Sequence, residues 1–83
     1  MKKILLDARE MIHPEPLRVS MGHLKSMSSE EYLYMINKKN PIPLIEIAIE
    51  KGFVHLSHLD NDEVWHIIIT KNSEQPLEEL LDV

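Results

Sequence analysis

The apolar residues of this chain change their spacing several times, and each change marks the border of an expected element. Residues 3–8 read Lys-Ile-Leu-Leu-Asp-Ala, a short apolar run typical of a buried strand. After Pro14 and Pro16 the apolar residues have the spacing of one helix face, at positions 17, 21, 24 and 27. The beginning of the chain therefore predicts a strand, a loop and a helix over residues 14–27.

A second unit of the same kind follows. Residues 32–36, Tyr-Leu-Tyr-Met-Ile, have the aromatic and branched side chains of a strand. After a polar loop, Pro41 and Pro43 open a second helix, and Gly52 lies where a C-terminal cap is expected. Both helices are thus expected to begin with two prolines, but the similarity ends there and predicts no internal repeat.

Two further strand-like runs, residues 53–60 and 63–70, flank Asn61-Asp62, which we interpret as a two-residue hairpin turn. With this turn, residue 58 pairs with 65 and residue 56 with 67. The face expected to join the core carries Val54, Leu56, His58, Trp65, Ile67 and Ile69. The other face is mixed in character and is a candidate contact surface, with Phe53, His55, Ser57, Leu59, Val64, His66 and Ile68.

The order of elements, β-α-β-α-β-β, predicts an α+β fold. Two crossover helices on one face of a mixed four-stranded sheet make a two-layer α/β sandwich. We expect this domain to span residues 1–71, with residues 72–83 as an acidic C-terminal tail. Ser73 can cap a short helix in the tail that begins near Pro76. That helix either docks through Leu77, Leu80 and Leu81 or frays, and its acidity favours fraying.

Composition excludes several classes of function. The chain has no Cys, which rules out disulfides, thiolate metal sites, thiol nucleophiles and persulfides. Its net charge is −5, but residues 1–73 carry nine bases against ten acids, so no electrostatic footprint for nucleic acid is expected. No apolar run approaches the length of a membrane span, and the first residues do not have the pattern of a signal peptide. We expect a cytoplasmic protein.

The chain resembles the TusA-like (SirA-like) sulfur-carrier superfamily over about residues 4–70. Those carriers have a strand ending in Leu-Asp and then Cys-Pro-x-Pro at the start of the first helix, matched here by Leu6-Asp7 and His13-Pro14-Glu15-Pro16. The resemblance implies the sheet order 1-2-4-3, with the fourth strand antiparallel to the others. Here His13 replaces the sulfur-bearing Cys and Glu10 the usual Gly, and an imidazole cannot carry a persulfide.

A closer resemblance is to an uncharacterised, Cys-less bacterial branch of that superfamily. The shared features are the segment Asp7-Ala8-Arg9-Glu10, an Asn-rich loop leading into Pro41-Ile42-Pro43-Leu44, and Trp65 on the last strand. This branch is a domain of unknown function. The resemblance therefore implies the fold and no activity.

The two helix starts are the main candidate binding site. Helix N-termini attract anions, and two of them are expected side by side at the ends of the first two strands. The residues expected to bind a ligand there are Arg9, Glu10, His13, Glu15 and Lys39. In the alternative interpretation Arg9 only pairs with its acidic neighbours, and the cluster is ordinary surface charge.

The other histidines predict no metal site and no cofactor. His55 and His66 share a face of the expected hairpin, one diagonal apart, but no third ligand lies near them.

Two functional hypotheses follow from these features. The favoured one is a non-catalytic module that binds a protein partner or a small ligand at the start of the first helix. The alternative is an enzyme or phosphoryl acceptor that uses His13 with Glu10 or Glu15. We expect a monomer or a weak homodimer, since the mixed hairpin face leaves an apolar patch.

Overall fold

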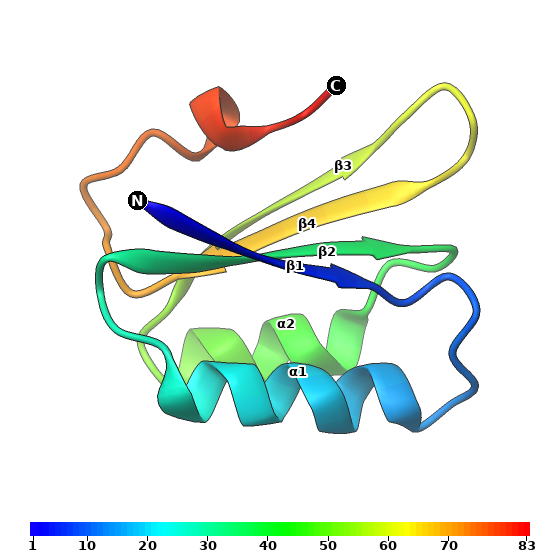
Figure 1. The fold of residues 1–83 in the computed structure, drawn as a ribbon, viewed down its shortest axis with the longest axis horizontal. Helices are drawn as coiled ribbons and strands as arrows, with labels where there is room; N and C mark the ends of the chain where they lie inside the picture. Colours follow the sequence, from blue (N-terminus) through cyan, green and yellow to red (C-terminus); the bar gives the residue numbers. More distant parts are fainter.

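A four-stranded mixed sheet with two helices on one face forms the body of the molecule (Figure 1). The structure is a computed structural model and describes residues 1–83. The elements are β1 (Lys2–Asp7), α1 (Glu15–Ser26), β2 (Glu31–Asn37), α2 (Ile42–Glu50), β3 (Val54–Leu59), β4 (Trp65–Thr70) and a short 3-10 helix, η1 (Leu77–Leu80). We call the face that carries the helices the inner face and the opposite one the outer face.

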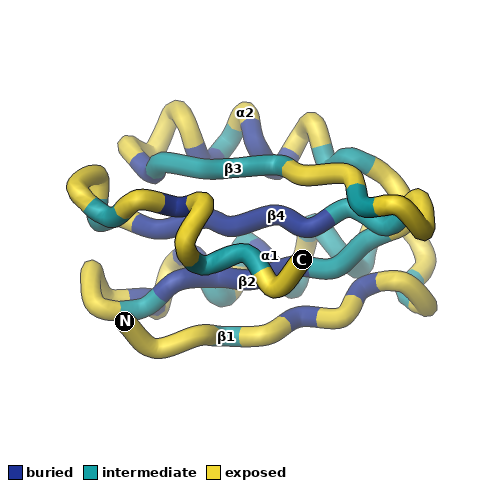
Figure 2. Tube along the Cα trace, turned by 90° about the horizontal axis from the view of Figure 1, so that it is seen from above, coloured by how far each residue is buried: buried dark blue, intermediate teal, exposed yellow.

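The strand order β1-β2-β4-β3 confirms the expected topology. β1 runs parallel to β2, while β4 lies between β2 and β3 and is antiparallel to both. Residues 66–70 of β4 are all buried, and Figure 2 shows this strand as the most buried part of the sheet. The α+β, two-layer architecture is therefore the one that the sequence predicts.

The inner face holds the larger of two apolar cores. Because side chains alternate along a strand, β2 sends Leu33 and Met35 toward the helices, and β4 sends Ile67 and Ile69. Each helix packs one apolar stripe against these side chains, and the two stripes include Leu24 and Leu44. Phe53 also belongs to this core. This core fixes both helices against the sheet and so positions their N-termini.

Both helices begin and end as the sequence predicts. Each has a proline within its first two positions, where no intrahelical N–H bond is lost. α2 ends before Gly52, whose φ of 84° lies in the left-handed region that glycine adopts without strain. Neither helix has the length and apolarity that crossing a membrane requires.

The hairpin turn differs from the expected one. Leu59 pairs with Trp65 and His58 with His66, so the register is one residue away from the two-residue turn at Asn61-Asp62. A third residue, Glu63, belongs to the turn and has a φ of 61°. The Asp60 carboxylate stabilises this turn by accepting hydrogen bonds from the backbone N–H groups two and four residues later.

The shifted register changes which residues of β3 and β4 share a face. Val54, Leu56 and His58 lie on the outer face with Ile68, and not with the inner residues of β4 as expected. Phe53, expected on the mixed face, belongs instead to the inner core. His55 and His66 consequently do not share a face, and the neighbour of His66 is His58, with ring centroids 6.5 Å apart.

The C-terminal segment covers the outer face (Figures 1 and 2). Leu77 is buried there against Tyr32, Tyr34 and Ile68. Leu80 and Leu81 pack on the same cluster and are half-buried. The segment therefore docks, and Ser73 does not cap its short helix, which has no side-chain cap.

Candidate functional site

A cleft of about 350 Å³ opens between the two β-α junctions, at the carboxyl ends of β1 and β2. Ligands of open α/β sheets commonly bind at this edge, and the volume falls within the range of small-molecule sites. The walls come from the β1-α1 loop, the end of β2, the β2-α2 loop and the first turns of both helices. The lining residues are Arg9, Met11, His13, Pro16, Leu17, Met35, Asn37, Lys38, Lys39, Asn40, Pro41, Pro43 and Leu44.

The wall of the cleft is basic, although the chain as a whole is acidic. It contains three of the nine Lys and Arg side chains, together with His13, and none of the fourteen Asp and Glu side chains. A concave site lined by one sign of charge concentrates field lines and attracts ions of the opposite sign. The cleft therefore favours an anion over a cation.

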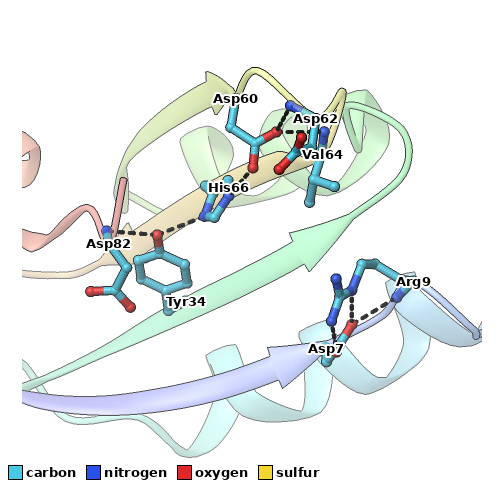
Figure 3. Close-up of polar contacts among 8 residues, drawn as sticks. All are labelled: Asp7, Arg9, Tyr34, Asp60, Asp62, Val64, His66 and Asp82. Carbon is cyan, nitrogen blue, oxygen red and sulfur yellow. Dashed lines mark hydrogen bonds and ion pairs between the residues drawn. The ribbon is translucent and has the colours of Figure 1, made fainter.

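Arg9 is held in place by Asp7, the last residue of β1 (Figure 3). The Arg9 Nε donates to Asp7 Oδ1 at 2.9 Å and a terminal nitrogen donates to Oδ2 at 2.6 Å. The backbone N–H of Arg9 also donates to this carboxylate. These hydrogen bonds lower the pKa of Asp7 to about 2, so the pair stays charged and Arg9 is oriented at the rim of the cleft.

Each helix leaves one backbone donor free at its start. In α1, Pro14 and Pro16 have no N–H, and the N–H of Glu15 bonds to the Ile12 carbonyl. The Leu17 N–H has no acceptor in the chain. The start of α2 repeats this arrangement, since Pro41 and Pro43 lack donors and Ile42 N–H bonds to Asn40, so that the Leu44 N–H is left without an acceptor.

The structure brings together three of the five residues that the sequence assigns to the site. Arg9, His13 and Lys39 all line the cleft. Glu10 does not, because its side chain is almost fully exposed and faces Lys38 at 3.8 Å. Glu15 is also absent from the wall and instead forms an ion pair with Arg18 on the surface of α1.

The apolar part of the cleft has no distinct pattern in the sequence. Met11, Met35 and the side chains of Leu17 and Leu44 complete the wall. The only available signal for Leu17 and Leu44 was their place one residue after the second proline of each helix start. Asn40 adds a polar element, because its Oδ1 is buried with no donor in the chain.

A second polar cluster lies on the outer face (Figure 3). His66 is buried, and its Nε2 lies 2.8 Å from Asp60 Oδ2 while its Nδ1 lies 2.7 Å from the Tyr34 hydroxyl. The Tyr34 hydroxyl in turn accepts a hydrogen bond of 2.9 Å from the backbone N–H of Asp82. The cluster thus connects the hairpin turn to the C-terminal segment across the sheet.

Comparison with known proteins identifies the family of this chain. The model of an uncharacterised conserved protein family, DUF2249, matches residues 5–71, which include all four strands from Leu5 onward and both helices. The chain belongs to the DUF2249 family. Every residue that lines the cleft lies within the DUF2249 region, whereas η1 lies outside it. No curated protein and no solved structure matches the chain at a significant level.

Proposed function

We propose that this protein is a non-catalytic binding module that captures a carboxylate in the cleft between its two β-α junctions. The carboxylate belongs either to a small molecule or to an acidic side chain of a peptide. The observation that carries this proposal is the wall itself, which gathers Arg9, His13, Lys38 and Lys39 and contains no acid.

Lys39 supplies the free positive charge. Arg9 is neutralised locally by Asp7, and Lys38 faces Glu10, but Lys39 makes no ion pair within the chain. A carboxylate that enters the cleft therefore gains an unshared cation without breaking an existing pair. The neighbouring Arg9–Asp7 pair is bidentate and stays intact, so it serves as a rigid rim.

The two free backbone donors add hydrogen-bonding capacity for an anion at the helix starts. Leu17 and Leu44 each contribute one N–H, because the prolines remove the other donors of the first helical turns. Two donors match the two oxygens of a carboxylate, and both helix dipoles add positive potential. The buried Asn40 Oδ1 has no donor within the chain, so a ligand whose hydroxyl or amino group reaches this oxygen would bind more tightly.

The resemblance to TusA-like sulfur carriers enters as part of this proposal. The observed strand order is the one that the resemblance implies. In those carriers the first helix start bears a reactive Cys, and here His13 occupies that position in the wall of the cleft. We propose that the chain keeps the site at the helix start for binding and has no part in sulfur transfer, since it has no Cys.

An enzymatic role for His13 receives less support from the geometry. A catalytic imidazole normally has an oriented partner, and the two expected carboxylates lie elsewhere, Glu10 beside Lys38 and Glu15 beside Arg18. The histidine with side-chain hydrogen bonds at both ring nitrogens is instead His66, on the outer face. The expected role of His13 is to contribute a polar ring to the wall of the cleft.

An NMR titration tests the proposal. The full chain is titrated at pH 6 with acetate, glycolate, inorganic phosphate and a short Glu-rich peptide, while the amides of residues 9–17 and 37–44 are followed. We expect weak, saturable shifts in both segments, with glycolate binding more tightly than acetate because of its hydroxyl.

Matched variants distinguish the cleft from general surface charge. Lys39→Gln is expected to weaken binding several-fold, whereas Lys25→Gln, on the exposed last turn of α1, leaves it unchanged. The relative affinities of the wild-type chain for glycolate and for the peptide show whether the preferred carboxylate belongs to a small molecule or to a peptide. The proposal would be refuted if the amide resonances of the hairpin or the C-terminal segment shifted while those of residues 9–17 did not.

A further inference from the structure

We infer that residues 77–82 are a built-in ligand of a second binding surface, on the outer face of the sheet. This surface recognises a segment with leucines three and four residues apart and acidic side chains between them. The expected partner is a separate chain that carries such a segment, for which the protein's own C-terminal segment must make room. The inference does not depend on the cleft, which lies at the carboxyl ends of β1 and β2.

The apolar contacts show what the surface accepts. Leu77 is 9% exposed and lies among Tyr32, Tyr34 and Ile68, whereas Leu80 and Leu81 only partly fill the adjoining space. Glu78 and Glu79, between these leucines, are exposed. The outer face therefore buries one leucine side chain and partly buries two others at its margin. The acidic side chains between the leucines stay exposed to solvent.

Polar contacts fix the end of the segment. The backbone N–H of Asp82 donates to the Tyr34 hydroxyl, which His66 holds in place at 2.7 Å (Figure 3). The Asp82 carboxylate pairs with Lys3 of β1, and the Lys3 ammonium also lies 4.8 Å from the centre of the Tyr34 ring. The surface thus offers a preformed acceptor for a backbone N–H next to a cation for an acid.

The segment is held less firmly than the elements of the body. η1 has a single turn of four residues and no side-chain cap, and Leu77 is its only buried residue. The link from β4, residues 71–76, is mostly exposed. Short terminal elements with few buried contacts open more readily than the core of a domain. A competing segment can therefore take the place of the docked one without disturbing the sheet.

The matched family region includes the outer-face residues that bind the C-terminal segment, but it does not include the segment itself. The DUF2249 region ends at residue 71, so Tyr34, His66 and Ile68 belong to it and the docked leucines do not. Without the segment, the outer face would expose a contiguous apolar patch around these residues, and such patches mark interaction sites. The charge of Lys3 makes an acidic segment the complementary partner.

A labelled peptide with the sequence of residues 72–83 is the probe. Its binding is measured by fluorescence anisotropy with the full chain and with the full-length double variant Leu77→Ser/Leu80→Ser, whose own segment no longer competes. We expect at least tenfold tighter binding by the variant. Adding Lys3→Glu to this variant should weaken binding several-fold, whereas adding Leu59→Ser, an exposed leucine of β3, should not.

The unmodified chain gives a second readout that requires no variant. At saturating peptide, the NMR resonances of residues 77–82 should move toward unfolded positions, while those of Tyr34 and Ile68 remain close to their docked values. Equal affinity of parent and double variant would overturn the inference. So would unchanged resonances of residues 77–82 at a peptide concentration that saturates the surface.

Discussion

The two faces of the sheet are covered in different ways, although the same strands build both. The inner face has two helices and an apolar cluster of eleven buried residues. The outer face has one short segment and a cluster of four, beside a buried histidine with hydrogen bonds at both ring nitrogens. Apolar packing thus dominates one face, while the other combines a smaller core with a polar network.

This difference indicates that the inner face contributes more to the stability of the fold than the outer face does. The apolar side chains between the sheet and the helices are close-packed. A substitution among them therefore shifts their neighbours, including the helix starts and the cleft. The outer cover is attached through one buried leucine, two half-buried leucines and hydrogen bonds that water can replace. The predictions below test this contrast between the two faces.

Adjacent isoleucines of β4 provide the sharpest test. Ile68 and Ile69 are both 0% exposed, but the first faces outward and the second inward. Ile69→Ala should destabilise the fold by about 4 kcal/mol, because the helices cannot close the cavity. Ile68→Ala should cost about 2–3 kcal/mol, since the C-terminal segment can settle into the space. Urea unfolding of both variants measures the difference, and equal losses would show that the outer cover is as rigid as the helices.

The hydroxyl of Tyr34 tests the polar network. Tyr34→Phe leaves the Nδ1 of His66 and the N–H of Asp82 without their partner and should cost about 1–3 kcal/mol. Tyr32→Phe is the matched control, because Tyr32 is also buried on this face and its hydroxyl makes no hydrogen bond. We expect the control to change stability by less than about 0.5 kcal/mol. Equal unfolding midpoints for the two variants would contradict a role for the network.

Acid should weaken the outer face through Asp60. In the folded chain the pKa of this carboxyl lies below its ordinary value, because it accepts hydrogen bonds from the Val64 backbone and from His66. A lowered pKa contributes stability that is fully present above the unfolded value of 3.8 and is lost as the pH falls through the folded pKa. The stability advantage of the parent over Asp60→Asn should therefore shrink below about pH 4.

Unfolding measured from pH 7 to pH 2.5 follows this loss. Asp62→Asn serves as the control, since the Asp62 carboxylate accepts no hydrogen bond in the same turn. If the difference in free energy of unfolding between the parent and Asp60→Asn stayed constant from pH 7 to pH 2.5, the charge of the Asp60 carboxylate would have no part in stabilising the turn.

The smallest expected effect concerns Glu15, which was expected in the ligand site and lies outside the cleft. Its ion pair with Arg18 is an exposed i,i+3 pair on α1, and such pairs contribute about 0.5 kcal/mol or less. Glu15→Gln should therefore barely change either stability or carboxylate binding. A several-fold change in binding would return Glu15 to the site.

The sequence predicts the elements and their order because each border carries a strong local signal. Two prolines mark each helix start, and Gly52 marks one helix end. The hairpin register has no comparable signal. It depends on Glu63 adopting a left-handed conformation that its residue type disfavours, and on the Asp60 side chain closing a longer turn. One extra residue in this turn exchanges the faces of a whole strand.

The candidate site could be predicted in part for a similar reason. Arg9, His13 and Lys39 follow adjacent parallel strands, and topology alone brings such loops together. The direction of a side chain within a loop or a first helical turn follows no period. Glu10 therefore faces Lys38 and Glu15 faces Arg18, and neither carboxylate lines the cleft.

The position of β4 has a consequence for the order in which the protein is made. The last strand in the chain is the central one, pairing with both β2 and β3. During synthesis, β3 has no neighbour to pair with until residues 65–70 emerge, and β2 has only β1. Folding therefore waits for this strand, whose pairings with β2 join residues as far apart in sequence as Tyr32 and Thr70. Until then, the edges of β2 and β3 that pair with β4 in the folded chain stay unpaired, and unpaired strand edges favour aggregation.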